Sequence, residues 1–251
     1  MRKNAEGCIL INKNFTGLIF FSPTFTVMIE IVSKTKNYAV VYKPPLIPTQ
    51  ADQSCDTDAM TLVSEALVSL GESGDLWLVH RLDRVVGGLL VFARNKDYAA
   101  KLSALVGGNG MTKEYFAIVE GACEGGVLRD FLYKDSKQSK AFVVNGSRNG
   151  AKEAELEYSK LAEKQTERGA RTLVRIKLHT GRFHQIRAQF ASRKLPLVGD
   201  GKYGSRDNRA KIPALFAMRL SFSIGSDTCD EIKIPNIDEY PWNIFERESY
   251  L

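Results

Sequence analysis

Short apolar runs of strand length open the patterned part of the chain. The first lies at residues 28–32, and the second at residues 39–42 ends at Lys43-Pro44-Pro45. Two successive prolines cannot continue a central strand, so a turn is expected there. Because no earlier segment shows a strand pattern, we interpret residues 1–27 as an N-terminal extension or an over-called start, and residues 28–251 as one domain.

Two segments have the three-to-four-residue apolar spacing of an amphipathic helix. They are residues 58–70 and residues 96–106. The apolar runs between them, 77–79 and 89–93, predict strands, and His80–Gly88 is expected to form the loop that joins these strands.

The second half of the chain is rich in strand candidates and has one further predicted helix, at residues 183–193. The strand candidates are residues 115–119, 127–131, 141–144, 156–161 and 172–178. Many strands and few helices, without strict alternation, predict an α+β fold. We expect a mixed, mainly antiparallel sheet with helices on its flanks.

Positive charge is concentrated in one stretch of the chain. The formal net charge is +6, and residues 168–219 hold thirteen Lys and Arg against Asp200 and Asp207. A solvated face normally mixes the two signs, so this segment predicts a surface that contacts RNA or DNA.

The remaining composition excludes several classes of protein. The four cysteines have no metal-ligand spacing and there are only three histidines, so no metal site is expected. Free thiols are typical of a reducing cytosol, so we predict a cytoplasmic protein. No stretch approaches the roughly 20 apolar residues of a membrane span, so no membrane partner is expected.

Three motifs hold the candidate chemistry. His80-Arg81-Leu82-Asp83 places a carboxylate on a loop between strands, where Arg81 and Arg84 would favour its ionised form; a surface salt-bridge loop is the alternative. Tyr115 opens a strand with a phenol that can stack on a base or exchange a proton, although a strand tyrosine often serves packing alone.

The third motif is Thr180–Arg187, a turn followed by a helix start with His184 and Arg187 three positions apart on one face. A buried Arg187 would need a carboxylate partner, since an unpaired buried charge is very costly. The alternative is a basic helix that lies along RNA. Gly199–Gly204 lacks the spacing of a phosphate-binding loop and is interpreted as a turn.

In this order, the motifs resemble the RluA-type pseudouridine synthases, over residues 29–220. The resemblance implies the fold of that family, with a central catalytic cleft. It makes Asp83 the catalytic aspartate, Tyr115 the tyrosine that packs on the target base, and Arg187 the ion-pair partner of Asp83. Departures such as Val86-Gly87, where Thr-Ser is common, affect the choice of substrate rather than these three residues.

The resemblance also implies substrate contacts. Arg81 would hold the target nucleotide out of its helix, and Ile186 and Leu215 would form apolar walls for the uracil. We also assign Arg182 and His184, which lie in the third motif, to substrate binding.

The reaction that the resemblance implies is the isomerisation of specific uridines in tRNA or large-subunit rRNA. It requires RNA as the partner and neither a metal nor another cofactor, and we expect a monomer. Two other classes stay open: a non-enzymatic RNA-binding or ribosome-assembly protein, and a glycosylase that would release free uracil.

Overall fold

The structure, a computed structural model, describes residues 8–10, 18–21, 28–108 and 110–251. The chain forms two compact units. Unit 1 consists of Met1–Met111 and Leu220–Ile232, and unit 2 of Thr112–Arg219 and Lys233–Leu251. The sequence-based division at residues 27 and 28 stays a prediction.

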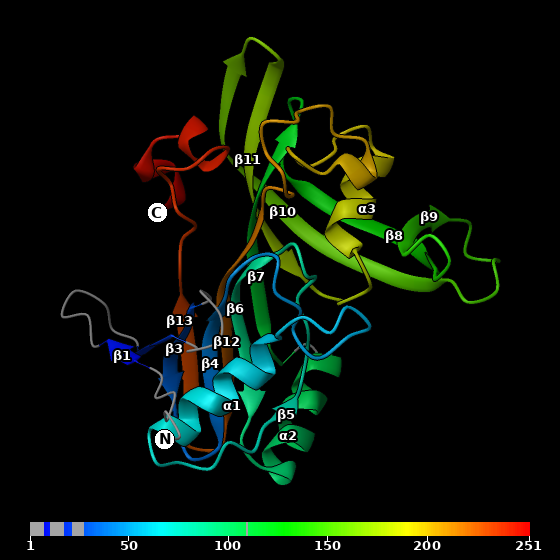
Figure 1. Cartoon of the computed structure of the whole chain (residues 1–251). Coiled ribbons are helices and arrows are strands. Elements are labelled where there is room, and N and C mark those ends of the chain that lie inside the picture. Colours follow the sequence, from blue (N-terminus) through cyan, green and yellow to red (C-terminus); the bar gives the residue numbers. More distant parts are fainter. Residues whose placement is uncertain (1–7, 11–17, 22–27, 109) are drawn as a thin grey trace. The chain divides into compact units, whose positions relative to one another are not determined.

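Unit 1 is built on antiparallel strands in the order β1-β2-β3-β4-β6 (Figure 1). Their bounds are Cys8–Leu10, Leu18–Phe21, Met28–Lys34, Tyr38–Lys43 and Gly87–Ala93. In addition, β5 (Trp77–Leu78) pairs with β6, and β13 (Asp227–Ile232) pairs with β12 (Leu215–Ile224). The expectation that strands begin only at Met28 was therefore wrong, since β1 and β2 precede it.

Two capped helices complete unit 1. Helix α1 (Ala59–Ser69) begins after Asp58, whose carboxylate accepts a hydrogen bond from the Thr61 amide over 3.0 Å. Helix α2 (Lys96–Gly107) begins after Asn95, which accepts from the Tyr98 amide over 2.8 Å. Both helices were predicted from their apolar spacing, and both are confirmed.

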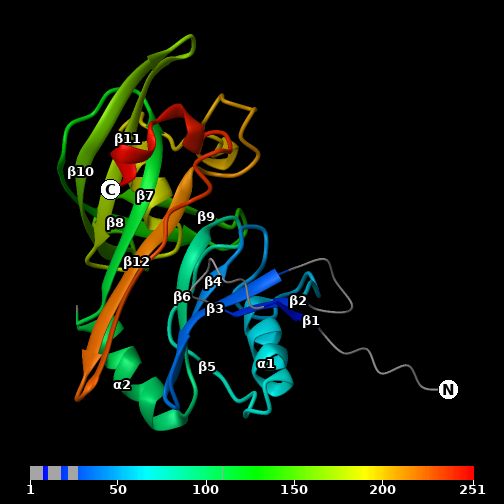
Figure 2. The same cartoon turned by 90° about the vertical axis from the view of Figure 1, so that its left-hand side faces the viewer.

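Strand β6 is buried at every position from Gly87 to Ala93. Figure 2 shows α1 and α2 on opposite sides of β4 and β6, so both faces of this strand are covered. A strand covered on both faces needs no alternation of apolar and polar residues, which explains the unbroken apolar run.

Gly87 and Gly88 correct one expectation, because they belong to β6 rather than to the loop before it. Gly88 pairs with Lys43 of β4. A Cβ on Gly87 would lie 3.1 Å from Cδ of Pro45, so a glycine lets the strand continue close beside the Pro-Pro turn.

Unit 2 contains antiparallel strands in the order β7-β11-β10-β8-β9. Their bounds, from β7 to β11 along the chain, are Thr112–Glu120, Gly126–Asp135, Lys140–Val144, Lys152–Thr166 and Gly169–Leu178. Helix α3 (Gln185–Ser192) packs against β9 and β8. Single turns of 3-10 helix are η1 (Gly201–Tyr203), η2 (Trp242–Ile244) and η3 (Arg247–Tyr250).

The length of β10 is the largest departure from the predicted elements. The apolar pattern predicted residues 156–161, whereas the strand runs from Lys152 to Thr166. Its flanks are rich in Glu, Lys and Gln, which have low strand propensity, but pairing with β8 and β11 supplies their backbone hydrogen bonds. The predicted α+β class with mainly antiparallel strands and flanking helices is confirmed; the catalytic cleft stays a prediction.

Within the described ranges, the helices lack the length and apolar character that crossing a membrane requires.

Candidate active site

The loop that carries Asp83 is fixed by hydrogen bonds on both sides of that residue. The Leu82 amide donates to Oγ1 of Thr49 over 3.2 Å, and this hydroxyl donates to the Leu82 carbonyl over 2.9 Å. On the other side, the Leu46 amide donates to the Arg84 carbonyl over 2.7 Å. Because the backbone is held at both points, the fold sets the direction of the half-buried Asp83 side chain.

Lys43, at the end of β4, is a fully buried cation beside the same loop. Its Nζ donates to the carbonyls of Pro44, Ile47 and Arg84 over 3.0, 2.8 and 3.3 Å. Three acceptors match the three N–H groups of an ammonium. Burial lowers the pKa of Lys43 to about 7, and the Asp83 carboxylate opposes this fall. Lys43 therefore ties β4 to the loop and places positive charge near Asp83.

The two arginines of this loop differ in their surroundings. Arg81 is exposed. The Arg84 guanidinium forms an ion pair with Asp56, and its Nη1 donates to Oγ of Ser54 over 3.0 Å. The charge of Arg84, which we expected to act on Asp83, is thus shared with a second carboxylate.

In unit 2, Arg187 lies on α3 with its side chain 5% exposed. Its Nε and Nη2 donate to the two carboxylate oxygens of Asp200 over 2.7 and 2.8 Å. Asp200 follows Gly199, which has φ +79°, and a Cβ there would lie 2.3 Å from the Ile212 carbonyl oxygen. Gly199 thus brings Asp200 under α3, where it supplies the carboxylate that a buried arginine requires.

Tyr203 connects the side chains of the third motif. Its hydroxyl lies 3.0 Å from Nδ1 of His184 and accepts the Ala141 amide over 2.8 Å. The Arg187 guanidinium lies over its ring, 5.0 Å from the centroid. His184 has φ +51°, a left-handed conformation that is uncommon outside glycine, so α3 begins one residue later than His184 and two later than Phe183, where its start was predicted.

The other predicted site residues of unit 2 are mostly buried. Tyr115, on β7, is 7% exposed, and Ile186 and Leu215 are 4% and 6% exposed. Arg182 is exposed, and its Nε donates to the Glu153 carbonyl over 2.8 Å.

The structure brings His184 and Arg187 together around Tyr203, within unit 2. It assigns Asp83 and Arg81 to unit 1, and Tyr115 and Arg187 to unit 2. The ion pair between Asp83 and Arg187 therefore stays a prediction.

Sequence reasoning missed the roles of three residues: Lys43, Asp200 and Tyr203. The need of a buried Arg187 for a carboxylate was a signal that could have identified Asp200, since Asp200 and Asp207 are the acidic residues of that basic stretch. Tyr203 lies in a segment that was interpreted only as a turn, and the local sequence pattern did not predict its contacts with His184 and Arg187.

Among the described residues, no group of three or more His, Cys, Asp or Glu is arranged to hold a metal ion. Cys55, Cys123 and Cys229 have free thiols.

Comparison with known proteins gives a family for this chain. Residues 37–192, more than half of the chain, match the family model of RNA pseudouridylate synthase. An uncharacterized RNA pseudouridine synthase of Aquifex aeolicus is 31% identical over 186 residues, which are 72% of this chain and 57% of that protein.

Two further relatives have named substrates. The tRNA pseudouridine synthase C of Vibrio vulnificus is 28% identical over 70% of this chain and 74% of its own length. The ribosomal large subunit pseudouridine synthase D of Borreliella burgdorferi is 30% identical over 65% of this chain and 48% of its own length. The chain thus spans about half the length of the Aquifex and Borreliella relatives.

A solved structure supports the fold independently. Human RNA pseudouridylate synthase domain containing 4 superposes with a TM-score of 0.67 at 22% identity, covering 82% of this chain and 89% of that one. The order of the His-Arg-Leu-Asp loop, the Tyr115 strand and the Arg187 helix agrees with the family match. The chain therefore belongs to the RNA pseudouridylate synthase family.

Proposed function

We propose that this protein converts specific uridines in tRNA or large-subunit rRNA to pseudouridine, with Asp83 as the essential carboxylate. The observation that supports Asp83 is the loop geometry: hydrogen bonds through Thr49, Leu46 and Lys43 fix the backbone on both sides of this one side chain. A catalytic group has to be held in its productive direction, because small misplacements cost large factors in rate.

The reaction breaks the bond between the uracil nitrogen and the ribose, rotates the base, and rejoins it through ring carbon 5. An ionised Asp83 can act as a nucleophile at the sugar or the ring, or as the base that removes a ribose proton. Each route uses the charged form, and the buried Lys43 supports that form. The isomerisation is redox-neutral and consumes nothing but the RNA, so it requires no oxidant or reductant.

The other predicted residues would serve the flipped base. Tyr115 would pack on the uracil and Arg187 would pair with Asp83. Ile186 and Leu215 would form apolar walls, in keeping with their burial. Arg81 would hold the nucleotide out of its stack, and Arg182 and His184 would also contact the substrate.

RNA is the proposed partner. The names of the Vibrio and Borreliella relatives support tRNA and large-subunit rRNA as the substrate classes to test. The basic stretch from Arg168 to Arg219 would contact phosphates and help to offset the cost of unstacking the target base, which is about a few kcal/mol. A cytoplasmic location and a monomeric state stay predictions.

The test is tritium release from carbon 5 of labelled uridine in unmodified tRNA and rRNA. Wild type, Asp83→Ala and the control Asp75→Ala, an exposed aspartate in another loop, are compared. We expect release by wild type and the control only. Release by Asp83→Ala at the wild-type rate would remove Asp83 from the mechanism. Free uracil among the products would favour the glycosylase, and RNA binding without any release would favour the assembly factor.

A further inference from the structure

A pocket of about 480 Å³ lies at the tip of the β10–β11 hairpin in unit 2. Its wall includes Lys164, Thr166, Glu167, Arg168, Arg209 and Ile244. Three of these side chains are cations and one is an anion. The Lys164 ammonium donates to the Ile244 carbonyl over 3.0 Å, which connects the hairpin to η2. The pocket is therefore a basic hollow with side chains from three separate segments.

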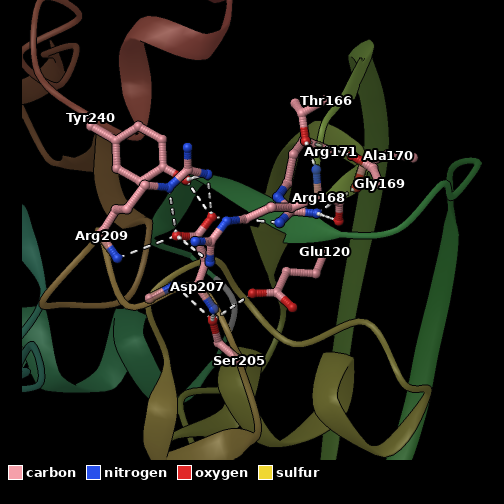
Figure 3. A network of polar contacts seen from close by, with 11 residues as sticks. Glu120, Thr166, Arg168, Gly169, Ala170, Arg171, Ser205, Asp207, Arg209 and Tyr240 are labelled. Carbon is pink, nitrogen blue, oxygen red and sulfur yellow. Dashed lines mark hydrogen bonds and ion pairs between the residues drawn. The ribbon is translucent and has the colours of Figure 1, made fainter.

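The Asp207 carboxylate, whose side chain is fully buried, binds arginines of this region in one network (Figure 3). Nε and Nη2 of Arg209 donate to the two oxygens of Asp207 over 3.0 and 2.7 Å, in a fork. Arg168 and Arg171 approach the same carboxylate at 3.9 and 3.5 Å, and the Tyr240 hydroxyl donates to it. The Arg209 fork holds the pKa of Asp207 well below its usual range, so the carboxylate is charged.

Asp207 fixes the orientation of guanidinium groups that are still half exposed. The side chains of Arg168 and Arg209 are 47% and 48% exposed, whereas that of Arg171 is 4% exposed. Arg209 also stacks on the ring of Tyr240, 4.4 Å from its centroid. Arg209 is thus pre-oriented with donors left for a ligand, which reduces the entropy lost on binding, while Arg168 lies within ion-pair distance of the same carboxylate.

The charge balance of the network favours an anion. One carboxylate faces three arginines, and Lys164 adds a fourth cation against Glu167. Within the part of the chain that the structure describes, Nε of the buried Arg171 has no hydrogen-bond partner. In a network that served stability alone, each arginine charge would have a carboxylate partner and each buried N–H group an acceptor, since buried polar groups are normally satisfied.

We propose that this pocket binds a phosphodiester group of the RNA, in addition to the contacts at the target uridine. The inference rests on the proposed function. Of the thirteen basic residues in the predicted RNA surface, it assigns Arg168 and Arg209 to one phosphate site. The N–H groups of Arg209 that Asp207 does not bind, and the half-exposed guanidinium of Arg168, can donate to phosphate oxygens, and Lys164 adds a point charge. Such a contact holds RNA in register without reading its sequence.

The test is a double variant, Lys164→Gln with Arg168→Gln, which leaves the Arg209 fork on Asp207 in place. The matched control is Lys96→Gln with Lys101→Gln, two exposed lysines of α2 that do not line the pocket. Fluorescence anisotropy measures affinity for a labelled tRNA transcript and for a fragment of large-subunit rRNA. Urea unfolding establishes that both double variants are folded.

The pocket variant is expected to bind RNA at least about tenfold more weakly than the control at low salt. The slope of log affinity against log salt is expected to fall by about one for each lost contact. Restoring the charge with Arg168→Lys in place of Arg168→Gln is expected to recover part of the affinity.

Equal affinities and equal salt slopes of the pocket variant and the control would overturn the inference. A loss of affinity for polyglutamate, with RNA affinity unchanged, would assign the pocket to an acidic peptide and also overturn it. Tritium release tests the proposed function separately. If the wild type releases no tritium but binds RNA more tightly than the pocket variant, the proposed isomerase activity is contradicted and the phosphate site is supported.

Discussion

Asp83 and Asp207 show two ways in which this fold uses a carboxylate. Asp83 is half-buried, and hydrogen bonds through Thr49, Leu46 and Lys43 fix the backbone around it. Asp207 is fully buried, and its oxygens are bound by arginines and by Tyr240.

The difference is in what is held in place: at Asp83 it is the backbone of the loop, and at Asp207 it is the charge of the carboxylate. Hydrogen bonds to the backbone hold the loop of the half-buried Asp83 in place, which suits a group that is proposed to meet a substrate. The arginines around Asp207 enclose its charge, so that carboxylate stabilises and orients other side chains. A substitution at each position should therefore affect a different property.

The largest effect is expected for Asp83→Asn, which keeps the shape and removes the charge. Turnover should fall by about 10²–10⁴-fold or more, because each proposed route needs the carboxylate. The urea midpoint should fall less than that of Asp207→Asn, because hydrogen bonds through Thr49, Leu46 and Lys43 still hold the backbone of the loop. Single-turnover tritium release beside urea unfolding measures both. A folded variant with a near-wild-type rate would contradict the distinction drawn here.

Asp207→Asn should show the opposite pattern, with a loss of about 3 kcal/mol in the free energy of unfolding. The buried Arg171 would lose its charged partner, and the other two arginines would repel one another. Chemical denaturation is the measurement. A loss below about 1 kcal/mol would mean that water already screens this network.

Lys43→Met should cost about 1–3 kcal/mol, because three carbonyls lose a donor. The pH dependence gives a sharper signature. Folded Lys43 loses its proton near pH 7, whereas unfolded Lys43 keeps it up to about its ordinary pKa of 10.5.

The unfolded chain thus binds more protons between these values, and the free energy of unfolding should rise as the pH rises from about 7 toward 10.5. This contribution should be absent in Lys43→Met. Unfolding curves of both proteins across that range test it, and parallel pH profiles would show that Lys43 titrates normally.

The smallest effect is expected for Tyr203→Phe. It keeps the ring beside Arg187 but leaves the Ala141 amide and Nδ1 of His184 without the hydroxyl, at a cost of about 1 kcal/mol. If His184 contacts RNA, KM should rise while kcat changes little. A change in kcat alone would place Tyr203 closer to the chemistry than the structure implies.

Patterns along the chain predicted the α-helices, most strands, the order of the motifs and hence the family, whereas they missed β1 and β2. The predicted features depend on residues within a few positions of one another, so they can be recognised along the chain. Examples are the helical spacing of α1 and α2, the apolar run of β6 and the residue types of the His-Arg-Leu-Asp loop. The need of a buried Arg187 for a carboxylate also followed from the sequence.

Which side chains meet depends on the packing of segments that lie far apart along the chain. Asp200 lies 13 positions from Arg187, Arg84 lies 41 positions from Lys43, and Asp207 lies 36 positions from Arg171. The full length of β10 likewise depends on pairing with β8 and β11 rather than on its own propensity. Local patterns record the interactions of neighbours, whereas burial and charge pairing arise when distant segments pack together and exclude water.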